Sequence, residues 1–178
     1  MKRIKYIVIV TVMLVIFTTL NVFASPYNLG QYTSVNEVST LLPPGVKQSK
    51  ATESAKPRGV FFARADLTIL NNGNGEVGAT AVSLFRVPVD EAYITIYLDR
   101  WDESAERWYQ IDYYEAEFYA KDYPDGLTTP NINVSFINQK KGCYYRLRGS
   151  FGALLGNEYE GFNPVTDGIL LDLSLIHI

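Results

Sequence analysis

Residues 93–98 read Tyr-Ile-Thr-Ile-Tyr-Leu, and this stretch decides the fold class. Its aliphatic residues, at positions 94, 96 and 98, share one side of an extended strand, because side chains alternate between the two faces. Tyr93, Thr95 and Tyr97 then share the opposite side. The pattern predicts a strand that packs one face on the core and turns a tyrosine-rich face outward.

Further runs of strand-forming residues lie on both sides of this one, with turn residues between them. They cover residues 61–69, 77–85, 108–118, 132–136, 143–147 and 166–171. Asn and Gly at positions 71–75 separate the first two runs, and both residue types tolerate the positive φ of a tight hairpin. No long segment has a helical period. The chain is therefore predicted to form an all-β, antiparallel β-sandwich of the immunoglobulin or fibronectin type III kind, with about seven strands.

The stretch 142–149, Gly-Cys-Tyr-Tyr-Arg-Leu-Arg-Gly, supports this prediction. It is similar to the penultimate strand of fibronectin type III domains, where a tyrosine early in the strand hydrogen-bonds across a corner. One sandwich architecture serves many functions, so this similarity predicts a fold and no activity.

A wider resemblance covers about residues 58–171. The chain resembles a family of small secreted proteins of Gram-positive bacteria that is known only as a domain of unknown function. The residues that carry the resemblance are Gly59, the strand 89–99 with Arg100 and Trp101 after it, Trp108, the block 144–149, and residues 166–169. The resemblance implies an exported β domain and supplies no catalytic residues.

The N-terminus has the three parts of a secretory signal peptide. Lys2, Arg3 and Lys5 form a basic start, an uncharged apolar run follows from residue 6 to 20, and Ala24 ends a short cleavage region. The apolar run is shorter than the roughly 20 residues of a membrane span. We expect residues 1–24 to be removed on export from a bacterium, so the membrane is a partner only during export. The expected location is extracellular, and attachment to the cell surface remains open.

The remaining boundaries follow from composition. Residues 25–58 are rich in Ser, Thr, Pro, Asn and Gln, which predicts a disordered arm or linker. Residues 59–172 would form the sandwich. Residues 173–178, Leu-Ser-Leu-Ile-His-Ile, are the translation of a transposase end used to prepare DNA for sequencing, so we interpret them as an adapter artefact. His177, the only histidine, would then be foreign to the protein.

Charge and composition exclude several classes of function. The chain has 16 basic and 19 acidic residues, and three of the basic ones lie in the predicted leader. An acidic mature chain is not expected to bind nucleic acid, whose phosphates require Lys and Arg. Cys143 is the only cysteine, so an internal disulfide is impossible. The sequence has no phosphate-binding glycine loop, nucleophile-elbow serine or zinc-ligand pair, and no cofactor is expected.

Acidic residues gather between positions 90 and 125, where eleven carboxylates accompany three basic side chains. Asp99, Asp102 and Glu103 are weak calcium candidates, because oxygen-rich loops bind this ion outside cells. They lack the regular ligand spacing and the turn glycine of a calcium loop. Solvated turn charge is the simpler interpretation, and acid–base catalysis by carboxylates in the 99–115 region is another.

The aromatic residues provide a binding hypothesis. Tyr93, Tyr97 and Tyr113 are predicted to face outward, and tyrosine is enriched at interfaces because it is flat, rigid and polar at its tip. Cross-strand stabilisation of the sheet is the alternative. Arg146 and Arg148 are also predicted to face outward, either to neutralise the acidic strands or to bind an anionic ligand.

Three functions stay open at this stage. The first is a secreted, non-enzymatic binding protein that presents a tyrosine-rich sheet face to a protein or glycan at a cell surface. The second is a carbohydrate-binding module. The third is a small hydrolase that uses acidic residues.

Overall fold

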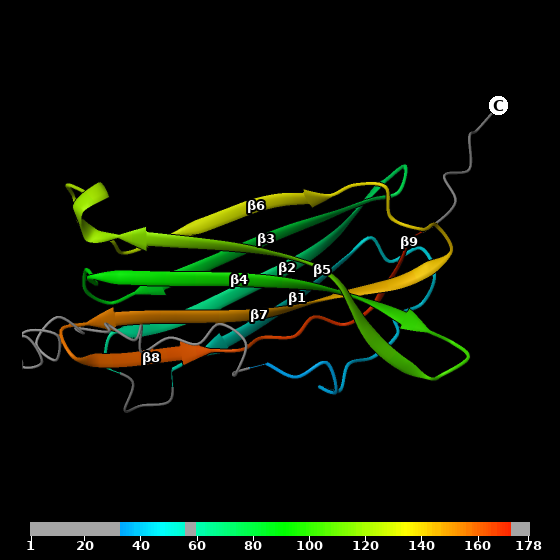
Figure 1. Ribbon diagram of the computed structural model, residues 1–178, viewed down its shortest axis with the longest axis horizontal. Coiled ribbons are helices and arrows are strands. Elements are labelled where there is room, and N and C mark those ends of the chain that lie inside the picture. The colour runs from blue at the N-terminus through cyan, green and yellow to red at the C-terminus, as the bar shows by residue number, and fades with distance from the viewer. Residues whose placement is uncertain (1–32, 56–59, 172–178) are drawn as a thin grey trace, which may run out of the picture.

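The computed structural model describes residues 33–55 and 60–171; the predicted leader and adapter lie outside these ranges. Within them, nine strands form two stacked antiparallel sheets (Figure 1). The predicted all-β sandwich is therefore confirmed. No helix of the described residues is long and apolar enough to cross a membrane.

The four-stranded sheet has the order β1-β2-β3-β6. Its strands are β1 (Gln48–Ser54), β2 (Phe62–Gly73), β3 (Glu76–Phe85) and β6 (Asn131–Phe136). The β2–β3 hairpin turns through Gly73, Asn74 and Gly75, all at positive φ, as the glycine and asparagine cluster predicts.

The five-stranded sheet has the order β5-β4-β7-β8, and β9 also pairs with β7. Its strands are β4 (Glu91–Asp102), β5 (Arg107–Tyr119), β7 (Cys143–Leu155), β8 (Glu158–Phe162) and β9 (Ile169–Leu171), and a 3-10 turn, η1 (Ala120–Asp122), follows β5. β8 pairs with the last residues of β7 and β9 with the first three, so together they form one interrupted edge. β5 forms the other edge.

The tyrosine of the stretch 142–149 makes the bond that the fibronectin-like prediction requires, although β8 and β9 both follow its strand. Tyr145 lies on β7 with its ring fully buried, and its hydroxyl donates to the carbonyl of Lys140 at 2.8 Å. This bond ties the strand to the loop before it, which is the arrangement of a tyrosine corner.

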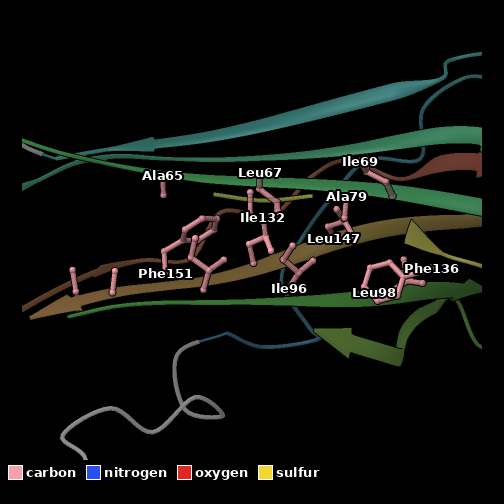
Figure 2. Close-up of a cluster of buried hydrophobic side chains, with 14 of the residues drawn as sticks. Ala65, Leu67, Ile69, Ala79, Ile96, Leu98, Ile132, Phe136, Leu147 and Phe151 are labelled. Carbon is pink, nitrogen blue, oxygen red and sulfur yellow. The ribbon is translucent and has the colours of Figure 1, made fainter. Parts of the chain in front are cut away.

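The core lies between the two sheets. Leu67 and Ile69 of β2 face Ile96 and Leu98 of β4 across it (Figure 2), and all four are fully buried. Burial of each such side chain contributes roughly 1.5–3 kcal/mol. Gly149 of β7 has a specific role here, because a β-carbon at this position would collide with the ring of Phe151.

Two strands were not predicted, and one prediction is wrong for that reason. β1 lies inside the segment 25–58 that composition assigned to a disordered arm, yet residues 48–54 pair with β2 along their whole length. This strand is held by its backbone ladder, so its polar sequence carries little apolar periodicity. β8 is the second addition, and it forms a hairpin with the end of β7.

Candidate functional site

All five predicted binding residues lie on one surface, the outer face of the five-stranded sheet. Tyr97 of β4 is paired with Tyr113 of β5 on one side and with Arg148 of β7 on the other. Tyr93 and Arg146 share this face by strand alternation. The predicted sidedness is therefore correct. The face itself is divided into a covered part and an exposed part.

A buried ion-pair cluster occupies the covered part. Asp99 of β4 is fully buried between Arg146, also fully buried, and Arg148, which is 2% exposed. The Nε atoms of Arg146 and Arg148 lie 3.0 Å and 2.7 Å from Asp99 Oδ2, and Arg148 Nη2 donates to Oδ1 at 3.0 Å. One carboxylate therefore neutralises only one of two buried guanidinium charges, and the second cation needs other oxygen partners.

Residues 33–42, which we call the strap, provide these partners. Arg146 donates to the carbonyl oxygens of Val35 and Glu37, at 2.7 Å and 2.5 Å, and to Ser39 Oγ at 2.9 Å. Arg148 donates to the carbonyl and hydroxyl of Thr33, both at 3.3 Å. Most of these acceptors are backbone atoms, so the strap is held largely through its main chain.

Aromatic rings complete the cluster. The guanidinium of Arg146 lies 4.5 Å from the ring centroid of Trp108, and that of Arg148 lies 4.8 Å from the ring of Tyr97. Such cation–π contacts are strengthened when water is excluded. Burial lowers the pKa of Arg146, while the neighbouring Asp99 acts in the opposite direction.

The strap then continues to the edge formed by β8 and β9. Leu42 N–H donates to the carbonyl of Gly168, and Gly168 N–H donates to that of Thr40, at 2.9 Å and 2.8 Å. Asp167 Oδ1 accepts a further bond from Thr40 N–H at 2.9 Å. We call the strap, the ion-pair cluster and the β8–β9 edge the closed side of the sheet.

Glu160 of β8 links the closed side to the other sheet. Its carboxylate accepts bonds from three successive backbone N–H groups, those of Val60, Phe61 and Phe62, at 2.6 to 3.1 Å. Burial acts to raise the pKa of Glu160, but these three bonds outweigh it and hold the pKa below its usual value. An open groove of about 720 Å³ lies beside this carboxylate, between β8 and the end of β1.

The predictions for two tyrosines and two arginines must be corrected. Tyr93 and Tyr97 are only 6% and 8% exposed, because Leu154 and Tyr159 pack against the first and Arg148 covers the second. Burial, reinforced by the charge of Glu115, raises the pKa of Tyr97. Arg146 and Arg148 do neutralise an acidic strand, but at the buried Asp99. None of these four side chains forms an open binding surface.

The calcium candidates are separated by their contacts. Both oxygens of Asp99 are engaged by arginine, and Asp102 accepts bonds from Ser104 and Ala105 in the β4–β5 turn. The hydroxyl bond from Ser104 lowers the pKa of Asp102. Glu103 is exposed in the same turn. Among the described residues no three His, Cys, Asp or Glu side chains lie close enough to hold a metal ion.

Tyr113 is the one predicted binding residue that the structure leaves exposed. It lies on β5, the free edge of the sheet, and is 56% exposed. Ile111 and Tyr114 of the same strand are 37% and 42% exposed, and the neighbouring acidic side chains, Asp112, Glu115 and Glu117, are exposed as well. We call the segment 111–119 of β5 the open edge.

A polar pocket of about 340 Å³, not predicted from the sequence, lies at the tip of the β4–β5 hairpin. Its aromatic lining comes from Trp101, Tyr109 and Tyr144, and Arg100 and Lys140 add positive charge. Trp101 packs edge-to-face on Trp108, with 5.3 Å between ring centroids. The aromatic residues on either side of the turn were visible in the sequence, but their contact with the loop before β7 depends on the fold.

Comparison with protein-family models gives no match, and comparison with curated proteins gives none. The resemblance to the secreted Gram-positive family stays a prediction from residues 58–171.

Proposed function

We propose that this chain is a secreted, non-enzymatic binding protein that contacts a partner at a cell surface through the open edge. Export is inferred from the sequence of residues 1–24. The observation that carries the binding proposal is the exposure of two neighbouring tyrosines, Tyr113 and Tyr114, on opposite faces of one strand. If these tyrosines served only to stabilise the sheet through cross-strand contacts, exposure of both rings would not be expected.

The chemistry of the open edge suits recognition. Tyrosine buries a large flat area at a small entropic cost, and its hydroxyl adds a directional hydrogen bond. One adjacent carboxylate is oriented by a tyrosine, since Tyr119 Oη donates to Glu117. A few aromatic residues of this kind usually carry most of the energy of an interface.

The test is adsorption of the fluorescently labelled mature chain to Gram-positive cells and to cultured animal cells. Replacement of Tyr113 and Tyr114 together by alanine is expected to weaken binding by about tenfold or more, as for interface hot spots. Ile137→Ala is the matched control, because Ile137 is 62% exposed but lies outside β5. Equal loss in the control, or none in the double variant, would contradict the proposal. Protease treatment of the cells separates protein from glycan partners.

The hairpin-tip pocket supports a second candidate, carbohydrate binding. A ligand pocket combines apolar surface with a few convergent polar groups, and this pocket has three aromatic side chains beside Arg100, Asp102 and Lys140. On a glycan array, Trp101→Ala and Tyr144→Ala are each expected to remove binding that Tyr113→Ala leaves intact. The reverse pattern would assign glycan binding to the open edge.

A further inference from the structure

The backbone of the open edge has no partner strand among the described residues. β5 pairs with β4 on one side only, and it is the first strand of its sheet. Edge strands present unpaired N–H and C=O groups that can hydrogen-bond to another extended chain. The register becomes irregular between Leu98 and Asp99 of β4, which leaves Ile111 opposite no residue. Beyond this point residues 112–119 pair with β4 without interruption.

Two hydrogen bonds identify which residues turn their backbone outward. Ala120 N–H donates to the carbonyl of Asp90 just before β4, so the even-numbered positions face β4. Tyr113 N–H donates instead to the side chain of Asp112, at 2.8 Å. Because backbone groups alternate along a strand, Tyr113, Glu115, Glu117 and Tyr119 direct their N–H and C=O groups to the free edge. The side chains of the same four residues lie on the outer face.

Charge decides which strand fits this edge. Two copies of β5 could pair with each other in an antiparallel ladder. In every register that pairs at least three of the four outward residues, however, a glutamate of one copy, Glu115 or Glu117, lies opposite a glutamate of the other. Like charges directly opposite each other destabilise a sheet. No ion pair joins either carboxylate to another described residue. An incoming strand with Lys or Arg at alternate positions would neutralise both.

We propose that the open edge binds an extended, basic segment of a partner protein by strand addition. The proposal rests on the proposed binding function and names its partner class. The partner's backbone pairs with Glu115, Glu117 and Tyr119, and also with Tyr113 when its N–H exchanges the Asp112 side chain for a carbonyl of the partner. The partner's basic side chains lie beside the two glutamates. Strand addition gives affinity through the main chain, and alternate side chains give specificity.

The test uses three synthetic nine-residue peptides of alternating Lys and Val, titrated into the mature chain by calorimetry. One peptide is unmodified, one is N-methylated at its Lys residues and one at its Val residues. In an antiparallel ladder the residues opposite Glu115 and Glu117 also donate their N–H groups. Methylation at Lys is therefore expected to weaken binding by about tenfold or more, while methylation at Val leaves it unchanged. The opposite result would still support strand addition, in the parallel direction.

A matched pair of protein variants tests the charge. Glu115→Gln with Glu117→Gln is expected to weaken the unmodified peptide, whereas Glu103→Gln with Glu106→Gln removes the same charge from the hairpin turn and should not. Equal binding of all three peptides would overturn strand addition, even if Tyr113 still governs adsorption to cells. If the peptides bind but replacement of Tyr113 by alanine leaves adsorption to cells unchanged, the proposed function would be overturned instead. Dimerisation of the chain that Glu115→Pro abolishes would assign the edge to a second copy and also overturn the proposal.

Discussion

Asp99 on β4 and Glu115 on β5 lie on the same outer face of the same sheet, one strand apart. Asp99 is fully buried between two guanidinium groups, and the strap covers them with its backbone carbonyls. Glu115 is exposed on a strand whose outer edge has no partner among the described residues. The closed side satisfies its charges within the chain, while the open edge leaves both charge and backbone available. The difference indicates where stability is built and where a partner can be accommodated.

Removal of the Asp99 carboxylate is expected to destabilise the closed side more than any other single substitution. Asp99→Ala leaves two buried guanidinium groups that repel each other, and loss of one partner from a buried ion pair costs about 3–5 kcal/mol. Urea unfolding at neutral pH measures this loss. Asp112→Ala on the open edge is the matched control, and it is expected to change stability by less than about 0.5 kcal/mol. Similar losses in both variants would remove the distinction between the two regions.

A smaller change releases the strap without removing charge. Lysine cannot reproduce the several directed donors of Arg146, so Arg146→Lys is expected to cost roughly 2 kcal/mol. The bonds between the strap and Gly168 should then open more often, which hydrogen exchange at Leu42 and Gly168 measures directly. Arg107→Lys, at the exposed start of β5, provides the control. Unchanged exchange at Leu42 in the Arg146 variant would show that the arginine does not hold the strap.

Glu160 tests whether the closed side depends on pH. Its folded pKa lies below the unfolded value of about 4.3, so the stability it contributes is present above that pH and is lost as the pH falls through the folded pKa. Glu160→Gln is expected to cost about 1–2 kcal/mol at pH 6. The difference in the free energy of unfolding between wild type and variant, measured by urea unfolding, should shrink toward pH 3. A gap that stays constant would contradict the assigned role, and Glu115→Gln should show no gap at either pH.

The sequence predicted the sandwich and the sidedness of its strands, but not which parts of a face are covered. Alternation alone places Tyr93, Tyr97 and Asp99 on one face, together with Arg146 and Arg148 of the partner strand. The cover comes from backbone carbonyls of the strap, which no side-chain pattern encodes. β1 escaped prediction for a similar physical reason, because an edge strand is held by its ladder and needs few apolar residues. Alternation made the same prediction for Tyr113 as for Tyr97, and only the position of β5 at the edge of the sheet leaves Tyr113 exposed.

The smallest expected effect concerns Tyr97, which lies between Arg148 of the closed side and Tyr113 of the open edge. Burial raises its pKa above the usual value of about 10, with a further contribution from the nearby Glu115, while Arg148 acts in the opposite direction. A raised folded pKa means that its contribution to stability is complete below about pH 10 and is lost as the pH rises through the folded value. Urea midpoints of wild type and Tyr97→Phe, compared between pH 8 and pH 11, should therefore show a shallower decline in the variant. Each protein serves as its own reference at pH 8, where the phenol is neutral in both folded and unfolded chains. Parallel declines would mean that Tyr97 ionises as readily in the fold as in the unfolded chain, and that the closed side ends before it.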